Sequence, residues 1–159
     1  MSRLHLHGPK TLMLALAVWL AVACTPSLRP LEPPVIRVSG LTLVDPQTVQ
    51  LDLMITNLTP TRLEPERAEV SVEINDQAFI EWEQPVEWTV SPNARDVVSL
   101  SAQAPSPKIR RWLSELSQGE RERLAWNVQM RFILPDENAV ETTANGFLYP
   151  RPGQPDQFR

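Results

Sequence analysis

The stretch from Leu124 to Leu134 constrains the fold more than any other part of the sequence, because every second residue in it is large and apolar. Side chains on a β-strand point alternately to its two faces, so this pattern buries one face and leaves the other in water. The apolar positions are Leu124, Trp126, Val128, Met130, Phe132 and Leu134. We therefore predict a long strand with one buried face.

Shorter segments with the same alternation occur on both sides of this strand. Sixteen prolines against five glycines also disfavour a helical bundle, since proline inside a helix costs about 3 kcal/mol. Seven or eight short strands with polar turns predict an antiparallel β-sandwich. The other expected strands cover residues 35–44 (with a bulge at Gly40), 48–56, 69–75, 77–83, 86–90, 96–102 and 139–149.

One short helix is expected after residue 106. Ser106 fits an N-cap and Pro107 the first helical position, and Gly119 ends the segment. The apolar side chains recur with helical spacing, at Ile109, Trp112, Leu113 and Leu116. This amphipathic helix should lie against the sandwich or across one end of it.

The first 23 residues have the layout of an export leader. Arg3 and Lys10 precede an unbroken apolar run over residues 12–23. As a helix this run would be about 18 Å long, whereas a membrane core is roughly 30 Å thick. A basic start, a short apolar middle and small residues at the end are typical of a signal peptide, which is removed on export.

The cleavage site has two interpretations. Residues 21–23 fit the A-x-A rule, and residues 20–24, LAVAC, resemble the bacterial lipobox. The only cysteine, Cys24, stands where the lipobox has its lipid acceptor, so we predict a lipoprotein; a soluble exported protein with an incidental thiol is the alternative. This resemblance implies diacylglycerol and an acyl chain such as palmitate on Cys24, and thus membrane attachment. Because Thr25 and not aspartate follows, it also implies the periplasmic face of the outer membrane.

The remaining chain divides into three parts. Residues 24–34 contain four prolines after the cysteine and should form an extended tether. Residues 35–149 should form the folded domain. Residues 150–159 have three prolines, one glycine and no apolar periodicity, so we expect a disordered tail.

Removal of the leader would leave little catalytic chemistry. Both histidines, His5 and His7, lie in it, and Cys24 would be acylated. General bases, nucleophiles and transition-metal ligands at neutral pH depend largely on these residue types. Glu81 and Glu83, beside Trp82 on one strand, could serve glycoside hydrolysis, but a solvated outer face explains them more simply. We expect no catalysis, cofactor, metal or small-molecule substrate.

Charge is distributed unevenly along the chain. The net charge of −4 and pI near 5.2 argue against nucleic-acid binding. Residues 64–87 carry eight acids and one base, and residues 108–131 carry six bases and three acids. A solvated face explains each block. As a sharper alternative, Glu73, Glu81 and Glu83 form a candidate interaction surface.

Three segments resemble the late embryogenesis abundant (LEA) type 2 family, whose fold unit is also called the water-stress and hypersensitive-response domain. They are residues 51–60, LDLMITNLTP, where the family has an apolar strand ending in Asn-Pro-Asn, and residues 63–76 and 106–116. In place of that motif's Pro-Asn stand Leu58 and Thr59. The resemblance implies an immunoglobulin- or fibronectin III-like sandwich over residues 35–149, no catalytic residues and a role in desiccation or other stress.

These observations together predict a non-catalytic envelope lipoprotein of the LEA type 2 kind that acts by binding or protecting. The alternative is an accessory subunit that docks on another envelope complex through an exposed sheet edge.

Overall fold

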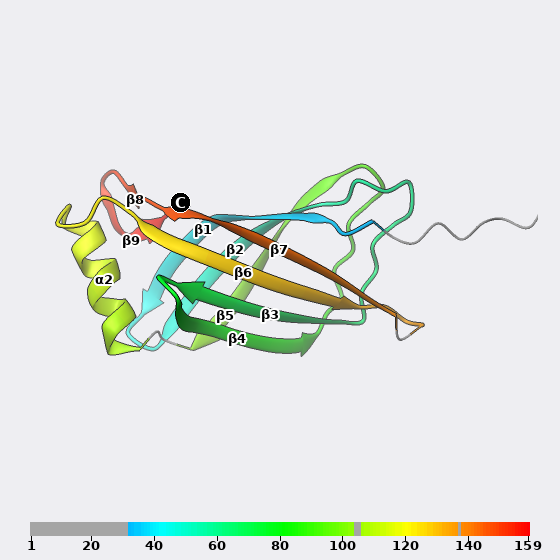
Figure 1. The fold of residues 1–159 in the computed structure, drawn as a ribbon, viewed down its shortest axis with the longest axis horizontal. Helices are drawn as coiled ribbons and strands as arrows, with labels where there is room; N and C mark the ends of the chain where they lie inside the picture. The colour runs from blue at the N-terminus through cyan, green and yellow to red at the C-terminus, as the bar shows by residue number, and fades with distance from the viewer. Residues whose placement is uncertain (1–31, 104–105, 137) are drawn as a thin grey trace, which may run out of the picture. The chain divides into compact units, whose positions relative to one another are not determined.

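The computed structural model describes residues 32–159, except residues 104–105 and 137. Two antiparallel sheets pack face to face (Figure 1). One sheet has five strands in the order β5-β2-β1-β9-β8, and the other has four in the order β4-β3-β6-β7. The prediction of an all-β sandwich with one short helix is therefore confirmed. The predicted signal peptide and Cys24 lie outside the described residues.

The element bounds agree closely with the alternating segments. The five-stranded sheet contains β1 (Val35–Asp45), β2 (Thr48–Thr56), β5 (Arg95–Gln103), β8 (Pro150–Arg151) and β9 (Gln154–Phe158). The four-stranded sheet contains β3 (Arg67–Ile74), β4 (Gln77–Pro85), β6 (Leu124–Ile133) and β7 (Ala139–Leu148). The helix, α2, spans Pro107–Ser117.

Strand β6 lies in the middle of the four-stranded sheet, between β3 and β7. Its apolar positions face the core, where Val128 and Phe132 are completely buried, while Gln129 between them is exposed. The facing strand β2 alternates in the same way and buries Val49, Leu51, Leu53 and Ile55. The core therefore consists of the inner faces of the two sheets, as the alternation predicts.

Two local backbone features, a bulge in β1 and the turn between β3 and β4, follow from the residues at these positions. The register between β1 and β2 shifts between Val38 and Gly40, which confirms the bulge expected at this glycine. A Cβ atom on Gly40 would stand 3.1 Å from Oδ2 of Asp52, so a side chain would crowd the neighbouring strand. In the β3–β4 hairpin, Asn75 and Asp76 have φ values of 47° and 60°. Both residue types tolerate this left-handed region, so they form the predicted two-residue turn.

Helix α2 begins and ends where the sequence predicts. The hydroxyl of Ser106 accepts a hydrogen bond from the backbone N–H of Ile109 at 3.4 Å, and Pro107 occupies the first turn. Ile109, Leu113 and Leu116 are buried, and Gly119 follows with a φ of 77°. Within the described residues, no helix combines the length and the apolar character needed to cross a membrane.

The prediction of a strand over residues 86–90 is wrong. This segment crosses from β4, in one sheet, to β5, in the other, and so cannot continue the pairing of either sheet. It is held by isolated backbone contacts instead: Val90 exchanges two hydrogen bonds with Leu63, at 2.9 and 3.0 Å. Trp88 packs edge to face on Phe132, with ring centroids 5.9 Å apart, so it still faces inward as predicted.

The prediction of a disordered tail over residues 150–159 is also wrong. These residues form β8 and β9, which turn at Gly153, whose φ is 76°, and β9 extends the five-stranded sheet beside β1 (Figure 1). Phe158 pairs with Leu41 and is only 1% exposed. One buried aromatic side chain and the pairing with β1 order this segment, although its own sequence has no periodicity. The folded domain therefore extends to the last residue.

Candidate functional site

The three acidic residues singled out from the sequence share the outer face of the four-stranded sheet. Glu73 lies on β3 and is half-buried, whereas Glu81 and Glu83 lie on β4 and are exposed. Antiparallel sheets in a sandwich commonly have one solvated face, and alternation places all three residues on it. The three residues thus lie on one surface, which we call the acidic face.

The pairing of β3 with β4 brings further polar groups to the acidic face. Glu83 stands opposite Glu69, and Glu81 stands opposite Ser71, whose hydroxyl donates a hydrogen bond to Oε1 of Glu81 at 2.9 Å. A shallow hollow of about 440 Å³ covers this part of the sheet. Glu81 and Glu83 line it, and Glu73 lies further along β3, outside it. The three predicted residues therefore do not converge on one point.

Two arginines compensate part of the negative charge. Arg67 lies 3.5 Å from Glu83, and Arg131 bridges Glu69 at 3.3 Å and Glu141 at 3.4 Å. All of these side chains are between 32% and 74% exposed, so each pair adds at most about 1 kcal/mol of stability. The acidic face keeps five carboxylates against two guanidinium groups, a net charge of −3, from Glu69, Glu73, Glu81, Glu83, Glu141, Arg67 and Arg131.

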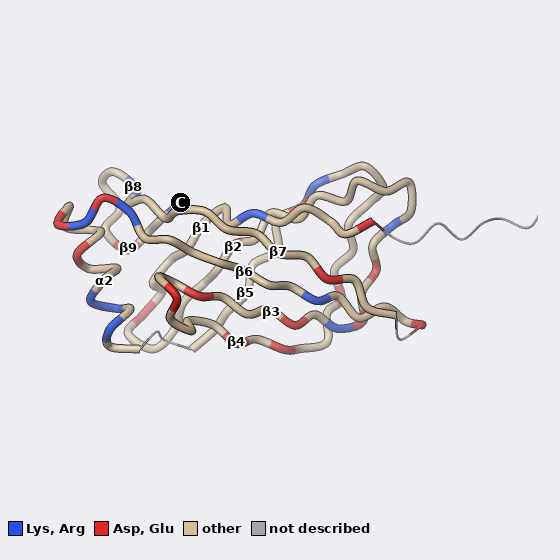
Figure 2. Tube along the Cα trace, viewed as in Figure 1, with Lys and Arg blue, Asp and Glu red and all other residues tan. Residues whose placement is uncertain are grey.

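Arg131 is a residue of the acidic face that the sequence did not identify as such. Along the chain it belongs to the basic block of residues 108–131, but β6 lies next to β3 and places it opposite Glu69. The other bases of that block lie on α2 and the turn after it (Figure 2), and Lys108 donates a hydrogen bond to Oε1 of Gln77 at the start of β4 at 3.1 Å. Lys108 lies 5.0 Å from the ring of Trp112, so its charge is partly held against the half-buried indole.

The chemistry available to the acidic face is that of an anionic binding surface. Its carboxylates can attract and hydrogen-bond cationic groups, and Arg131 and Ser71 hold some of them in place. Among the residues that the structure describes, no three His, Cys, Asp or Glu side chains are grouped to hold a metal ion.

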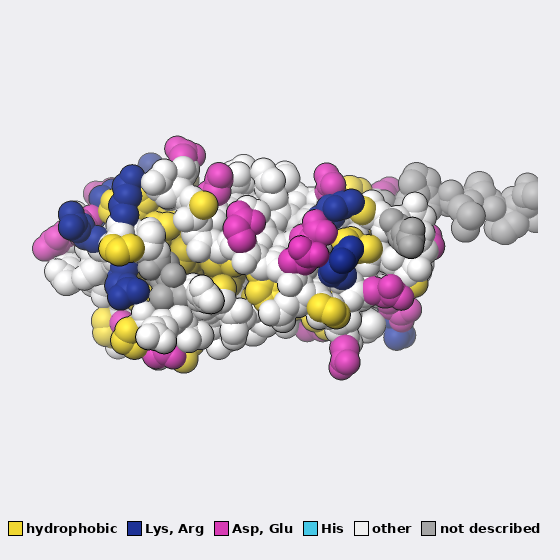
Figure 3. All heavy atoms as spheres, turned by 90° about the horizontal axis from the view of Figure 1, so that it is seen from below, with side chains coloured by type: hydrophobic (Ala, Val, Ile, Leu, Met, Phe, Trp, Pro, Cys, Tyr) yellow, Lys and Arg dark blue, Asp and Glu magenta, His cyan; other side chains and the backbone are white. Residues whose placement is uncertain are grey.

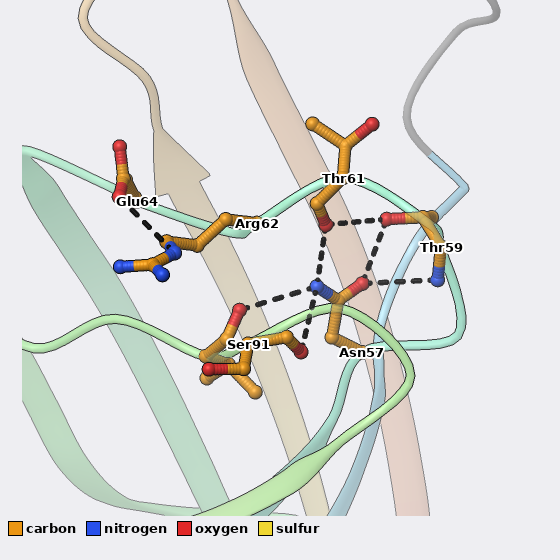
Figure 4. A network of polar contacts seen from close by, with 7 residues as sticks. Asn57, Thr59, Thr61, Arg62, Glu64 and Ser91 are labelled. Carbon is orange, nitrogen blue, oxygen red and sulfur yellow. Dashed lines mark hydrogen bonds and ion pairs between the residues drawn. The ribbon is translucent and has the colours of Figure 1, made fainter.

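A second polar site, around Asn57, joins two loops at one end of the sandwich (Figure 4). The side-chain N–H groups of Asn57 donate to the carbonyls of Thr61 at 2.8 Å, Val90 at 3.2 Å and Ser91 at 3.3 Å. Its side-chain oxygen accepts from the N–H of Thr59 at 3.1 Å and from the Thr59 hydroxyl at 2.8 Å. Asn57 is 1% exposed. Its hydrogen bonds tie the loop after β2 to the loop before β5.

The Asn57 site shows what the segment that resembles the family motif does in the structure. Thr59 supplies both a backbone and a side-chain donor to Asn57, although Leu58 and Thr59 replace the Pro-Asn of the motif. Buried polar groups are costly unless they are hydrogen-bonded, and here the amide is fully used. We interpret Asn57 as a structural residue and the acidic face as the candidate functional surface.

Comparison with known proteins shows a shared fold and no sequence relative. No family model and no curated protein matches the chain. The protein AT1g01470 from Arabidopsis thaliana is similar with a TM-score of 0.50 at 14% identity, over 80% of this chain and 89% of that one. A protein from Archaeoglobus fulgidus gives 0.47 at 12% identity, over 76% and 98%. A candidate LEA protein gives 0.44 at 9% identity, over 96% and 98%.

At these identities the likeness to the Arabidopsis thaliana protein concerns the fold alone. The class defined so far is a β-sandwich domain with an anionic outer sheet face. The LEA type 2 resemblance of residues 51–60, 63–76 and 106–116 stays a prediction from the sequence.

Proposed function

We propose that this chain is a non-catalytic lipoprotein of the cell envelope, of the LEA type 2 kind, that binds or protects envelope components in a stress-related role. The observation that carries the proposal is the short apolar run that ends in the chain's only cysteine. A lipid anchor at Cys24 fixes the sandwich to a membrane, and residues 25–34 separate the two. The periplasmic face of the outer membrane is the proposed location.

The acidic face supports a binding role. Its side chains are exposed or half-buried, and Arg67 and Arg131 compensate only part of its five carboxylates, which leaves a net charge of −3. A surface of this kind attracts basic proteins or other cationic material over distances of about the Debye length, roughly 8 Å at physiological salt. No catalytic step is needed for such a role.

Membrane fractionation tests the anchor. We expect wild-type protein to sediment with membranes and to incorporate labelled palmitate, and Cys24→Ala to do neither, because the variant has no thiol to acylate. Cys24→Ser is the matched control for side-chain size: it also lacks the thiol, so it should behave like Cys24→Ala, but its hydroxyl keeps the size of the side chain. A Cys24→Ala protein that still sediments with membranes, together with unlabelled wild-type protein, would contradict the lipoprotein assignment.

Charge reversal tests the acidic face. The triple variant Glu73→Lys, Glu81→Lys, Glu83→Lys changes the local charge by six units without touching the core. We expect the variant to fold, and to lose binding to a basic probe such as polylysine that wild-type protein binds at 50 mM salt and releases at 300 mM. The matched triple Gln control should bind at an intermediate level. Equal binding by wild-type and Lys variants would show that the acidic face is only a solvated surface.

A further inference from the structure

Two exposed aromatic rings lie at the end of strand β7. Phe147, in the strand, is 44% exposed, and Tyr149, directly after it, is 45% exposed. Leu148 between them is buried, so alternation places both rings on the outer face of the four-stranded sheet. Among the residues that the structure describes, these two are the only exposed aromatic side chains. Exposed apolar groups that gather on one face often mark a binding site.

A hollow of about 380 Å³ lies beside Phe147 on the same face. Its floor is Ala125, which stands directly opposite Phe147 in the pairing of β6 with β7, and a methyl group beside a phenyl ring leaves space above the sheet. The turn at Asn75 and Asp76 forms the other wall. It is fixed there because the side-chain oxygen of Asn75 accepts from the N–H of Ala125 at 3.0 Å, and the N–H of Asn75 donates to the carbonyl of Ala125 at 2.9 Å. The volume lies within the range of ligand sites, about 300–1,000 Å³.

Two asparagines complete the hollow. Asn127 on β6 and Asn145 on β7 stand directly opposite each other, and both line it. Asn127 is half-buried and Asn145 is exposed. Within the described part of the chain neither side chain is hydrogen-bonded to the protein, in contrast to that of Asn75. Each amide has two N–H donors and one oxygen acceptor, so the hollow presents both kinds of group to a ligand.

Arg123 stacks on the ring of Phe147 and holds it in place. Its guanidinium carbon lies 4.1 Å from the ring centroid, within the range of a cation–π contact. Basic side chains gather at the end of the domain where α2 lies (Figure 3), and Arg123 begins the strand that leaves this end. Along the chain Arg123 and Asn127 flank Ala125, so the guanidinium and the amides lie at opposite ends of the floor of the hollow. A ring held in this way needs little ordering when a ligand binds.

These groups match the chemistry of a neutral sugar. One face of a pyranose ring is lined by C–H groups, which contact the negative face of an aromatic ring favourably. Sugar hydroxyls both donate and accept hydrogen bonds, as side-chain amides do. Alternate residues of a strand are about 6.8 Å apart, close to the length of one sugar unit, so Phe147 and Tyr149 can contact successive units. The carboxylate that lines the hollow, Asp76, is offset by Arg123, so the site has no net charge to select an ion.

We propose that the hollow and the two rings bind a neutral oligosaccharide, with one sugar unit in the hollow against Phe147 and the next over Tyr149. The amides of Asn127 and Asn145 hydrogen-bond to the hydroxyls of the unit in the hollow. A proline-rich peptide also docks on aromatic rings. It fits less well, because proline has no N–H to donate to the amide oxygens. The proposal goes beyond the proposed function, since it depends neither on the lipid anchor nor on the charge of the acidic face.

Titration calorimetry on the full chain, in a detergent whose headgroup is not a sugar, measures the binding. The probes are cellotetraose, chitotetraose and maltotetraose, which are neutral and differ in linkage or substituent. We expect at least one of them to bind saturably, with a Kd between about 10 μM and about 10 mM. Raising the salt from about 50 to about 300 mM should change this Kd less than about twofold, because the contacts are not ionic. Backbone amide signals of Ala125 and Phe147 should shift on titration.

Variants of the site locate the bound sugar. Phe147→Ala removes the ring beside the hollow and should weaken binding at least about tenfold, whereas Phe147→Trp keeps an aromatic face and should stay within about threefold of wild type. Tyr149→Ala and Asn145→Ala should each weaken binding about threefold or more, since each removes one contact. Val97→Ala is the matched control, because Val97 is 53% exposed but lies on β5 in the other sheet, and it should leave the Kd unchanged.

Several outcomes would overturn the proposal. They are no saturable binding of any probe up to about 10 mM, equal binding by folded Phe147→Ala and wild-type protein, or binding of decaproline at Phe147 in place of the sugars. The double variant Glu81→Lys, Glu83→Lys separates this site from the acidic face. It should bind the sugar as wild type does, and loss of sugar binding in this variant would place the ligand on the acidic face instead. If circular dichroism shows that Phe147→Ala is unfolded, Tyr149→Ala and the amide shifts on wild-type protein decide.

Discussion

Strands β6 and β9 both bury a phenylalanine in the core, but they are specified in opposite ways. Phe132 on β6 and Phe158 on β9 are 0% and 1% exposed. Strand β6 has five apolar positions in alternation within its ten residues, whereas β9 has a single large apolar residue among its five. The comparison shows that a strand can be defined by its own periodicity or by the site at which it docks.

The two strands also differ in the number of residues that pair with neighbouring strands. Strand β6 pairs with β3 over eight residues and with β7 over ten. Strand β9 pairs with β1 only at Leu41 and Thr42. Two backbone hydrogen bonds between Tyr149 and Arg159, at 2.8 and 3.0 Å, join the two ends of the β8–β9 segment. Disruption of β6 should therefore affect the whole domain, and disruption of β9 mainly one edge.

The largest effect is expected from Val128→Asp in β6. Val128 is fully buried, so the variant places an unpaired carboxylate between the sheets and should lower the free energy of unfolding by more than about 4 kcal/mol. This is a large part of the stability of a small domain, about 5–15 kcal/mol. Chemical denaturation followed by tryptophan fluorescence measures the loss.

The neighbouring residue provides the control for this prediction. Gln129 points to the outer face and is exposed, so Gln129→Asp should change the free energy of unfolding by less than about 0.5 kcal/mol. Similar destabilisation by the two variants would mean that β6 does not present the assigned faces.

A smaller effect is expected from Phe158→Ala in β9. Loss of this buried ring should cost about 3 kcal/mol, because the cavity left beside Leu41 cannot be filled by the short tail. Hydrogen exchange should then increase in residues 150–159 and at Leu41 while β6 stays protected. Gln154→Ala, at an exposed position of the same strand, should leave both readouts unchanged. Wild-type stability of Phe158→Ala would mean that β9 does not contribute to the core.

The candidate surface shows the same division between local and distant information. Glu81 and Glu83 are two residues apart, so strand alternation alone predicts that they share a face. Their relation to Arg131 could not be predicted, because it depends on β6 lying next to β3 in one particular register. The position of β5 at the edge of its sheet likewise depends on the strand order, which the alternation of β5 itself does not specify.

The sequence by itself determined the elements whose signals are local. Alternation placed β2, β3 and β6, the cap at Ser106 placed α2, and Asn75–Asp76 placed the hairpin turn. These signals are local because side-chain direction and capping depend on residues within a few positions of each other.

Only the tertiary structure decided the conformation of the segments that lack such a local signal. Residues 86–90 alternate but cross between the sheets, and residues 150–159 do not alternate but complete one of them. In both cases contacts with residues distant in the sequence stabilise the segment. Val90 pairs with Leu63, and Phe158 pairs with Leu41. Burial and backbone pairing with distant residues outweigh local preference there, because those contacts exist only once the two sheets have assembled.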